Sequence, residues 1–441
     1  MGGRWISQNK TRPGVFINFT AVSAPTMQVG DRGIGTLAIP LSWGPENTII
    51  EVYSTDLTDG SSLSKVGFTA FDAEAKLLNL MLSGCYKALV YRLDSGGVRA
   101  TATQGSLTAI AKYPGTKGNM ITIVITESDG LFTVTTYVDG VSRDAQTAST
   151  VQELVNNDYV EFSGFGALDI NAGITLTGGT NGTVTPATAY PAYLSLARKA
   201  RWQTMALTQN NDTFAAQFAK FAEEMRDTEG KYVQVVVANY DAADYHGVIN
   251  SDCGVMMGDV EVTAEEATAW VAGITAGASV TESAGSQAFA GATRILNTRT
   301  NSEYEEALQH GIFVLRTNID GQIVPEKDIN SLHTFTSKLS KDFRLNQVIR
   351  VLDEVGTRLT DTWERSYRDK IQNNENGRNV FKSDVLTYLN ELQRIGAIDN
   401  FEGADDIEIS AGKEKTSVML TINRLNPIAA MDTLYALVYV I

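Results

Sequence analysis

The spacing of hydrophobic and polar residues changes along the chain, and each change predicts a different kind of structure. In residues 191–318, apolar residues at helical spacing alternate with short, continuous apolar runs. A helix is predicted at residues 213–226 and a buried strand at residues 232–238. Thr263 and Ser302 are predicted to cap two further helices. Helices that alternate with buried strands predict a layered sheet covered by helices.

Threonine and glycine become frequent between residues 96 and 185, where apolar and polar residues alternate. Two Asp-Gly pairs, at residues 129–130 and 139–140, interrupt the alternation and are typical of tight hairpin turns. A short helix is expected at residues 149–156, and the glycine-rich residues 178–182 predict a flexible linker. The stretch therefore predicts an all-β domain inserted into the α/β domain.

Charged residues at helical spacing dominate the last quarter of the chain. Residues 341–374 predict one long helix interrupted only at Gly356, and residues 381–395 predict a second helix. Alternating stretches at residues 406–410 and 417–423 predict strands that follow these helices. Helices followed by strands predict an α+β domain.

The sequence ends in an apolar stretch without a charged residue, Leu-Tyr-Ala-Leu-Val-Tyr-Val-Ile at residues 434–441. As a strand it would extend roughly 26 Å, and its backbone edge would recruit other chains unless something paired with it. The residues alone leave two interpretations open. The strand lies in the sheet of its own subunit, or it completes the sheet of a neighbouring subunit by strand exchange.

Together these patterns predict a multidomain protein of mixed α+β and α/β class. It has a layered α/β core, an inserted all-β domain, an α+β C-terminal domain, and extended N- and C-terminal strands. The predicted divisions are an N-terminal arm at 1–20, a discontinuous α/β core domain at 21–95 and 186–336, the β-domain at 96–185, and the C-terminal domain at 337–441.

Composition and charge exclude several classes of protein. With 441 residues and 43% hydrophobic residues, the chain can bury a core in each of several domains. Its formal charge of −15 disfavours binding to nucleic acid, because such binding depends on clustered Lys and Arg. The longest apolar run, near residues 269–280, is too short to span a bilayer. The two cysteines, Cys85 and Cys253, indicate neither a disulfide framework nor a zinc site.

The residue patterns of common active sites are not found in the sequence. Gly33-x-Gly35 lacks the third glycine of a dinucleotide fingerprint, and no glycine loop is followed by Lys-Ser or Lys-Thr. The three histidines, His246, His310 and His333, are far apart in sequence and are expected to be surface or core residues. Asp241 and Asp244 follow a predicted strand, where turn formation explains them best. We expect no enzyme, no cofactor and no metal site.

A basic stripe stands out against the acidic chain, because basic residues outnumber acidic ones between residues 338 and 382. On a helical projection five arginines fall within a band of about 120°. They are Arg344, Arg350, Arg358, Arg365 and Arg368. One interpretation is a solvated helix face with pairs such as Asp361 and Arg365, and the other is a docking stripe for an acidic partner.

Three motifs give the chain a resemblance to contractile tail sheath proteins of phages and phage-tail-like bacteriocins, especially those of Gram-positive systems. They are Arg-Pro-Gly-Val-Phe-Ile at residues 12–17, Tyr-Pro-Gly-Thr-Lys-Gly-Asn at 113–119, and Asn-Pro-Ile-Ala-Ala-Met-Asp-Thr-Leu-Tyr at 426–435. Their order and spacing make the resemblance specific. Residues 428–431 depart from the Pro-Val-Asp-Ser/Ala-Met form of similar proteins.

The resemblance implies a structural subunit that polymerises around an inner tube in an extended, metastable state. Contraction then drives the tube through a bacterial cell envelope. The implied partners are copies of the chain in a helical or stacked-ring polymer with hexameric rings, the inner tail tube protein, and baseplate and tail terminator proteins. Neither nucleic acid binding nor direct membrane insertion is implied. The implied location is a virion tail or tailocin particle assembled in the bacterial cytoplasm.

The resemblance also assigns roles to residues. The inserted β-domain projects outward, and the C-terminal domain faces the tube with the five arginines of the basic stripe. An N-terminal arm and a C-terminal strand join sheets of neighbouring subunits. The arm comprises Pro13, Gly14, Val15, Phe16, Ile17 and Phe19, and the strand comprises Leu434, Tyr435, Ala436, Leu437, Val438, Tyr439 and Val440. Flexible segments at residues 20–30 and 424–431 are expected to absorb the movement of the subunits.

Two other hypotheses remain alongside the sheath. One is a static self-assembling shell or surface-array subunit that uses the same strand exchange. The other is an α/β enzyme with a β-insert, suggested by the strand–helix alternation of residues 191–318. Two subunit spacings, before and after a trigger, would distinguish the sheath from a shell, and saturable binding of a small substrate would indicate the enzyme.

Overall fold

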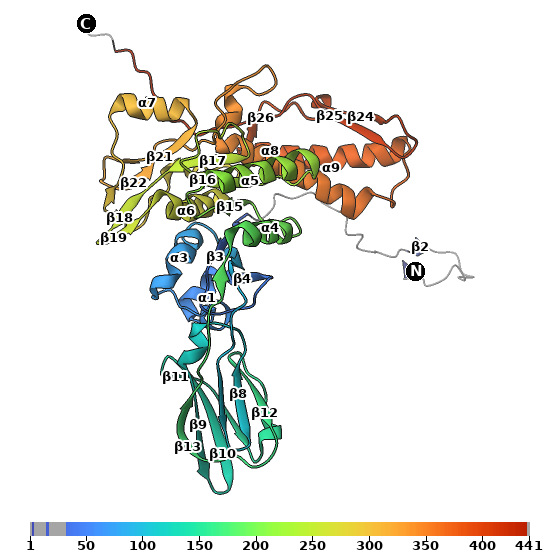
Figure 1. Cartoon of the computed structure of the whole chain (residues 1–441). Coiled ribbons are helices and arrows are strands. Elements are labelled where there is room, and N and C mark those ends of the chain that lie inside the picture. The colour runs from blue at the N-terminus through green and yellow to red at the C-terminus, as the bar shows by residue number, and fades with distance from the viewer. Residues whose placement is uncertain (1, 4–14, 17–31, 439–441) are drawn as a thin grey trace. The chain divides into compact units, whose positions relative to one another are not determined.

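The structure, a computed structural model, describes residues 2–3, 15–16 and 32–438 (Figure 1). The chain divides into two compact units. The core unit comprises Gly30–Thr357 and Pro427–Ile441, and the C-terminal unit comprises Met1–Val29 and Arg358–Asn426. Two short strands, β1 (Gly2–Gly3) and β2 (Val15–Phe16), pair in parallel register. Pro13, Gly14, Ile17 and Phe19 of the predicted arm lie outside the described residues, as do the predicted flexible residues 20–30.

An eight-stranded sheet forms the centre of the core unit, in the order β22-β21-β17-β16-β15-β3-β5-β4. Its six inner strands are parallel, and only the edge strands β22 and β4 run antiparallel to their neighbours. In chain order the strands are β3 (Ile34–Ile39), β4 (Ile49–Tyr53), β5 (Lys87–Arg92), β15 (Thr204–Ala206), β16 (Gln234–Ala238), β17 (Val248–Asp252), β21 (Ile312–Thr317) and β22 (Ile323–Pro325).

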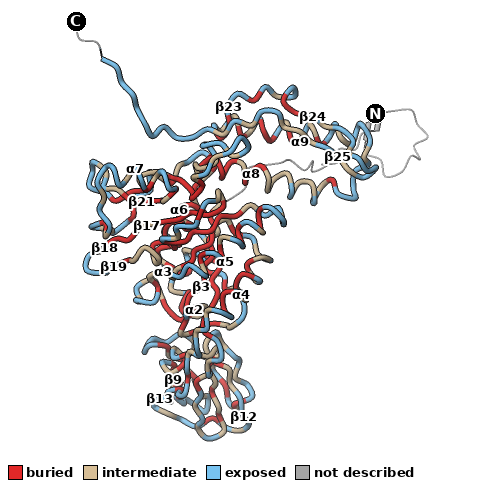
Figure 2. Tube along the Cα trace, turned by 45° about the horizontal axis from the view of Figure 1, so that its top comes forward, coloured by how far each residue is buried: buried red, intermediate tan, exposed pale blue. Residues whose placement is uncertain are grey.

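Both faces of this sheet are covered, which explains why its strands are continuous apolar runs. In β16, Val235 and Val237 pack into one apolar cluster and Val236 into the other. Helices α4 (Pro186–Ala197) and α5 (Asp212–Glu223) contribute to the first cluster, and α3 (Lys76–Leu82) and α6 (Ala264–Gly277) contribute to the second. Figure 2 shows the buried residues concentrated in this part of the core unit.

Close contact between α3 and α6 depends on glycine at the end of one helix and inside the other. A side chain at Gly84 would come within 2.3 Å of the backbone nitrogen of Ile274, and one at Gly273 within 2.1 Å of the carbonyl oxygen of Met81. Because backbone atoms cannot move aside as a flexible side chain can, these two positions require glycine. The smaller elements of the core unit are α1 (Ser54–Asp59), α2 (Ser62–Val66), α7 (Asn301–Gln309), and the three-stranded sheet of β18 (Val255–Met257), β19 (Val260–Val262) and β20 (Arg294–Ile295).

The inserted β-domain consists of two sheets, ordered β11-β10-β9-β13 and β12-β8-β7, that share one apolar cluster. Asp129 and Asp139, with the glycines that follow them, have positive φ, as the predicted hairpin turns require. The chain enters through β6 (Asp94–Ser95) and returns through β14 (Thr183–Val184). The strands are β7 (Thr101–Gln104), β8 (Leu107–Ala111), β9 (Ile121–Ser128), β10 (Leu131–Val138), β11 (Val141–Ala148), β12 (Val160–Gly164) and β13 (Asn171–Thr175).

The C-terminal unit contains two helices and short strands. The boundary between the units falls within α8 (Asn346–Thr362), and α9 (Glu375–Arg394) is the second helix. Strands β24 (Ile407–Ala411) and β25 (Val418–Ile422) form an antiparallel hairpin, and β23 (Ile398–Asp399) pairs with β26 (Asn426–Pro427). The class is therefore mixed α/β and multidomain, as predicted.

The long helix predicted at residues 341–374 was wrong in three details. The long helix does not begin at residue 341, because Leu345 is extended and separates one 3₁₀ turn from α8. It also continues through Gly356 without interruption; a side chain there would collide with the ring of Tyr232 at 2.4 Å. It ends in a π-helical turn, Trp363–Tyr367.

Two other local predictions were also wrong. The helix predicted at residues 149–156 is a single 3₁₀ turn, Val151–Glu153. Helix α7 is capped by Thr300 and not by Ser302, because Thr300 and Glu303 form a reciprocal capping box. By contrast, Thr263 caps α6 as predicted.

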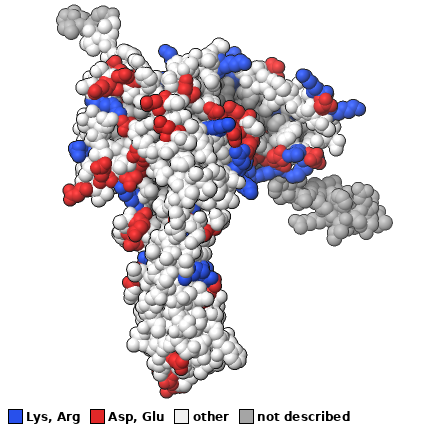
Figure 3. Space-filling view, viewed as in Figure 1, with Lys and Arg blue, Asp and Glu red and all other residues white. Residues whose placement is uncertain are grey.

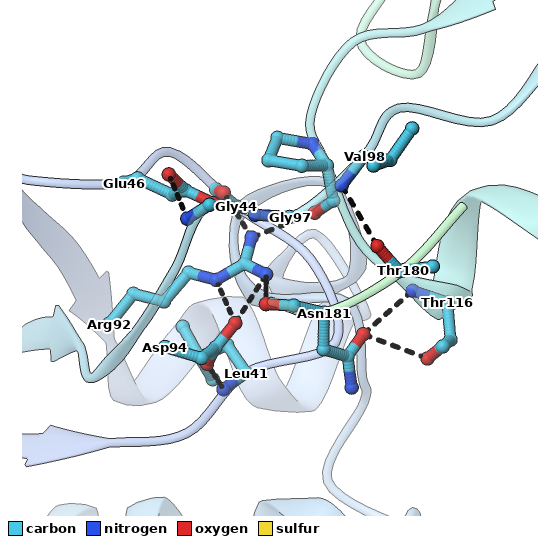
Figure 4. A network of polar contacts seen from close by, with 12 residues as sticks. Leu41, Gly44, Glu46, Arg92, Asp94, Gly97, Val98, Thr116, Thr180 and Asn181 are labelled. Atoms are coloured by element: carbon cyan, nitrogen blue, oxygen red, sulfur yellow. Dashed lines mark hydrogen bonds and ion pairs between the residues drawn. The ribbon is translucent and has the colours of Figure 1, made fainter. Parts of the chain in front are cut away.

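Arg92 joins the β-domain to the core sheet (Figure 4). Its fully buried guanidinium lies 2.5 Å from the carboxylate of Asp94. It also donates to the carbonyl oxygens of Gly44, Pro114 and Asn181 at 2.8, 2.7 and 3.1 Å. Pro114 and Asn181 belong to the inserted domain, so one side chain holds two of its segments to the end of β5.

The segment predicted to be a flexible linker is held by the same network. Asn181 accepts hydrogen bonds from the backbone and hydroxyl of Thr116 at 2.7 and 3.0 Å. Gly179 and Asn119 exchange two hydrogen bonds of 2.8 and 2.9 Å. The linker prediction is therefore corrected: glycines at 178 and 182 provide positive φ for turns, and neighbouring polar groups fix the segment.

We expect Arg92→Met to lower the free energy of unfolding by about 3–5 kcal/mol, because it leaves the Asp94 carboxylate buried without its partner. Urea denaturation of the full chain measures the change. Arg143→Met, at an exposed position of β11, is the matched control and should change stability by less than about 0.5 kcal/mol. Equal stability of the two variants would contradict the role of Arg92.

Candidate assembly surfaces

The C-terminal segment, defined as residues 433–438, is exposed and unpaired. Leu434, Tyr435, Leu437 and Val438 have exposed fractions of 88%, 92%, 77% and 79% (Figure 2). None of these residues belongs to a strand, so the described part of the segment is not in the sheet of its own subunit. Tyr439 and Val440 lie outside the described residues. An apolar, extended segment without a partner is a surface that another strand can cover.

Residues 430–432, which we call the root of the segment, are held to the core unit by two contacts. The backbone nitrogen of Ala430 donates to Oε1 of Gln347 at 2.9 Å, and the carboxylate of Asp432 pairs with Lys327 at 2.8 Å. Earlier in the chain, Arg424 forms ion pairs with Glu402 and Asp406. The segment predicted to be flexible at residues 424–431 is thus held by polar contacts, although Met431 within it is exposed, and beyond Asp432 no such contact holds the described residues to the core unit.

The β24–β25 hairpin is a second candidate surface. It is two-stranded, and among the described residues no further strand pairs with either edge. Its register places Ile409 opposite Leu420, which gives one apolar face. Helix α9 contacts β24 on the C-terminal unit. A hairpin whose edges are open can accept an additional strand from another chain.

A groove in the C-terminal unit runs beside β25. A cavity of about 480 Å³ is lined by residues that include Trp363, Tyr367, Phe381 and Val418. The rings of Trp363 and Phe381 meet edge to face with centroids 5.2 Å apart, and those of Tyr367 and Phe381 at 4.7 Å. Aromatic groups beside an open strand edge provide apolar contacts for the side chains of an added strand.

The five arginines of the basic stripe do not share one exposed surface. Arg350 is fully buried, donating to the carboxylate of Asp328 and to the carbonyl oxygen of Glu282 at 2.7 Å each. Arg344 is partly buried and donates to three backbone carbonyl oxygens at 2.8–2.9 Å. The projection failed for Arg350 because the first turns of α8 are buried on all sides.

The remaining three arginines belong to the C-terminal unit. The side chains of Arg365 and Arg368 are 68% and 61% exposed, and they pair with Asp361 at 3.5 Å and Glu364 at 2.8 Å. Arg358 is partly buried. Exposed i,i+4 pairs of this kind contribute little to folding stability. Arg365 and Arg368 are therefore available for a partner, whereas Arg350 is not.

The described residues contain no group of His, Cys, Asp and Glu that could hold a metal ion. Both cysteines are buried, and burial raises the pKa of Cys85 to about 11. Asp244 accepts hydrogen bonds from the backbone nitrogens of His333 and Thr334 at 2.7 and 3.1 Å, and these bonds stabilise the loop that contains His333 and Thr334. In the part of the chain that the structure describes, no helix is long and apolar enough to cross a membrane.

Charged side chains are unevenly distributed over the surface. On the face shown in Figure 3, the β-domain carries few charged residues, whereas acidic side chains gather around α7. Helix α7 itself contains Glu303, Glu305 and Glu306. The β-domain therefore offers a mostly uncharged surface on this face.

Comparisons with known proteins identify the family. Residues 95–181 match the phage tail sheath protein beta-sandwich domain, residues 182–331 match its central domain, and residues 339–441 match the phage tail sheath C-terminal domain. The chain belongs to the phage tail sheath family. The resemblance found in the sequence is thereby confirmed, and proteins of this family are structural sheath subunits.

Several known proteins are similar to this chain over nearly its whole length. The phage-like element PBSX protein XkdK of Bacillus subtilis is 33% identical over 97% of both chains. The crystal structure of a sheath tail protein from Desulfitobacterium hafniense has 40% identity and a TM-score of 0.80, and covers 94% of this chain and 96% of its own. The helical sheath of the anti-feeding prophage in its contracted state has 13% identity and a TM-score of 0.55, over 98% and 99% of the chains, and shares the fold.

His246 gives the sheath chain a testable pH dependence. Burial, with the nearby positive charge of Arg226, lowers the pKa of His246 to about 4. The centroid of its ring is 4.4 Å from that of Tyr245 and 6.3 Å from that of Phe343. Because the unfolded chain binds a proton near pH 6.5 and the folded chain does not, stability falls as the pH drops from 6.5 towards 4.

We expect His246→Phe to make this loss of stability shallower, by up to about 1.4 kcal/mol per pH unit. The check is urea denaturation at several pH values between 4 and 7. Val141→Phe, at an exposed position that carries no titratable group, should retain the wild-type slope. An unchanged slope in His246→Phe would show that His246 is protonated equally in both states.

Proposed function

We propose that the chain polymerises around an inner tail tube in an extended, metastable state and contracts to drive the tube through a bacterial envelope. The observation that supports this proposal most is the exposed, apolar and unpaired C-terminal segment. Two sheaths that share this fold, those of the anti-feeding prophage and of an extracellular contractile injection system, have structures in the contracted state.

Strand exchange links the subunits in this proposal. The strand from Leu434 to Val440, which contains most of the C-terminal segment and two residues beyond it, adds to an open edge of the β24–β25 hairpin of a neighbouring subunit. The N-terminal arm, Pro13 to Phe19, joins the same intersubunit sheet. The added strand would pair its backbone groups and place alternate side chains over the groove beside Trp363 and Phe381.

This linkage suits a polymer that changes length. The backbone hydrogen bonds between exchanged strands stay formed while the rigid units of each subunit rotate, so a ring does not separate from the next ring. A difference of a few kcal/mol per subunit between two states, summed over many identical copies, does mechanical work without nucleotide hydrolysis. The other partners are baseplate and tail terminator proteins, and hexameric rings are the proposed symmetry.

The placement of domains follows from the same proposal. The inserted β-domain projects outward, and the C-terminal unit faces the tube. Arg365 and Arg368 supply the tube contact, with Arg358 at its margin, because their side chains remain accessible. Contacts of exposed charges are weak and screened by salt, which suits a tube that must slide free. The assembled particle is a phage tail or a tailocin, built in the bacterial cytoplasm.

We expect truncation after Asp432 to abolish polymerisation, because it removes the exchanged strand and leaves both root contacts of the segment in place. Co-expression with the tube protein, followed by electron microscopy, measures assembly. The full chain should form striated tubes, and the truncated chain should remain a folded, soluble monomer. Normal tubes from the truncated chain, or persistent monomers of the full chain, would contradict the proposal.

We expect Arg365→Glu with Arg368→Glu to weaken the association of sheath and tube, because the reversed charges repel an acidic tube surface. Co-sedimentation of sheath with preformed tubes at several salt concentrations measures the effect. The matched control is Arg394→Glu, since the Arg394 side chain in the same unit is 71% exposed and pairs with Glu391. If the double variant and the control bind alike, the tube contact lies elsewhere.

A further inference from the structure

Two contacts hold the chain immediately before the C-terminal segment leaves the core unit. The backbone N–H of Ala430 donates to Gln347 at 2.9 Å, and Asp432 pairs with Lys327 at 2.8 Å. Gln347 lies on the first turn of α8, and Lys327 follows β22. Thus α8 and the residue that follows β22 both hold a root that comes much later in the sequence.

The residues that make these contacts lie next to a buried, hydrogen-bonded base. The carboxylate of Asp328, next to Lys327, accepts hydrogen bonds from the backbone of Ala284 and from the side chains of Asn346 and Arg350, at 2.9, 2.9 and 2.7 Å. Asp328, Asn346 and Arg350 are all buried. A base held by three hydrogen bonds to one carboxylate fixes the positions from which Lys327 and Gln347 reach the root.

The contacts themselves are weak. The side chains of Lys327 and Asp432 are 36% and 50% exposed. A partly exposed ion pair or a single hydrogen bond shifts an equilibrium by roughly two- to ten-fold. The proximity of Lys327 lowers the pKa of Asp432, which agrees with an attractive contact at neutral pH. The root is therefore held in one place and can detach without unfolding the core unit.

The root also has room to move. Residues 429–432 line one side of a cavity of about 780 Å³, whose other walls include Glu282, Ser286 and Gln287. Within the described residues, the segment beyond Asp432 makes no further ion pair that would hold it to the core unit. Release of the two contacts would thus change the direction in which the segment leaves the subunit.

We propose that Lys327 and Gln347 form a releasable clasp on Ala430 and Asp432 that sets the exit direction of the C-terminal segment. This inference rests on the proposed function, because the exit direction matters only if the segment reaches a neighbouring subunit. The clasp presents the segment in one direction in the free subunit, and its release lets the same segment follow a neighbour when the sheath contracts.

Hydrogen exchange of the soluble monomer tests the clasp without requiring polymerisation. We expect Asp432→Asn to increase the exchange rate of the Ala430 amide by roughly five-fold, and Lys327→Met to do the same. The double variant should exchange no faster than either single variant, because both changes remove one contact. Raising the salt concentration should accelerate exchange in the wild-type chain and not in the variants.

The matched control is Asp158→Asn, which removes the partly exposed Lys112–Asp158 pair of the β-domain. It should leave exchange at Ala430 unchanged. The clasp would be overturned if the two variants had additive effects on the hydrogen-exchange rate of the Ala430 amide. It would also be overturned if both variants had the wild-type rate.

Failure of the clasp and failure of the proposed function give different results. If the wild-type chain forms no tubes, the proposed function fails, but the hydrogen-exchange rates of the Ala430 amide still show whether the clasp exists. If tubes form and Ala430 exchange is unaffected by either variant, the clasp fails and strand exchange stands.

Discussion

The need to pair the backbone and cover the apolar side chains of residues 434–438 is the constraint on which the proposed assembly depends. An extended segment of this composition attracts another strand unless its own subunit covers it. Its described residues find no such cover in the core unit, and Leu434 and Tyr435 are almost fully exposed. The root contacts at Ala430 and Asp432 mean that the unpaired segment leaves the core unit from a defined place. A sheath built by strand exchange turns this exposed segment into the connection between subunits.

Buried arginines give the core unit the rigidity that such a connection requires. Arg92 ties two segments of the β-domain to the central sheet, and Arg350 ties the start of α8 to Asp328 and Glu282. A buried, paired charge adds little net stability, but removing one partner is costly, so such pairs favour one arrangement over others. In the proposed assembly, a force applied at an exchanged strand would move the unit as a body, because its packed parts do not slide past one another.

Sequence patterns predicted the elements whose cause is local. The run Val235–Val237 predicted a strand buried on both faces, and the Asp-Gly pairs at residues 129–130 and 139–140 predicted the hairpins. Arg350 shows the limit: a helical projection gives its angle, but its burial depends on Glu282 and Asp328, which are distant in the sequence. The pairing of the C-terminal segment could not be decided either, because alternation predicts a strand without specifying which chain completes it.

Cryo-electron microscopy of the sheath assembled on its tube, before and after contraction, tests strand exchange most directly. We expect residues 434–438 of one subunit to pair with β24 or β25 of a neighbour in both states, while the distance between subunits changes. A segment folded back onto its own subunit in either state, or one that loses its neighbour on contraction, would contradict exchange as the connection that keeps the rings joined.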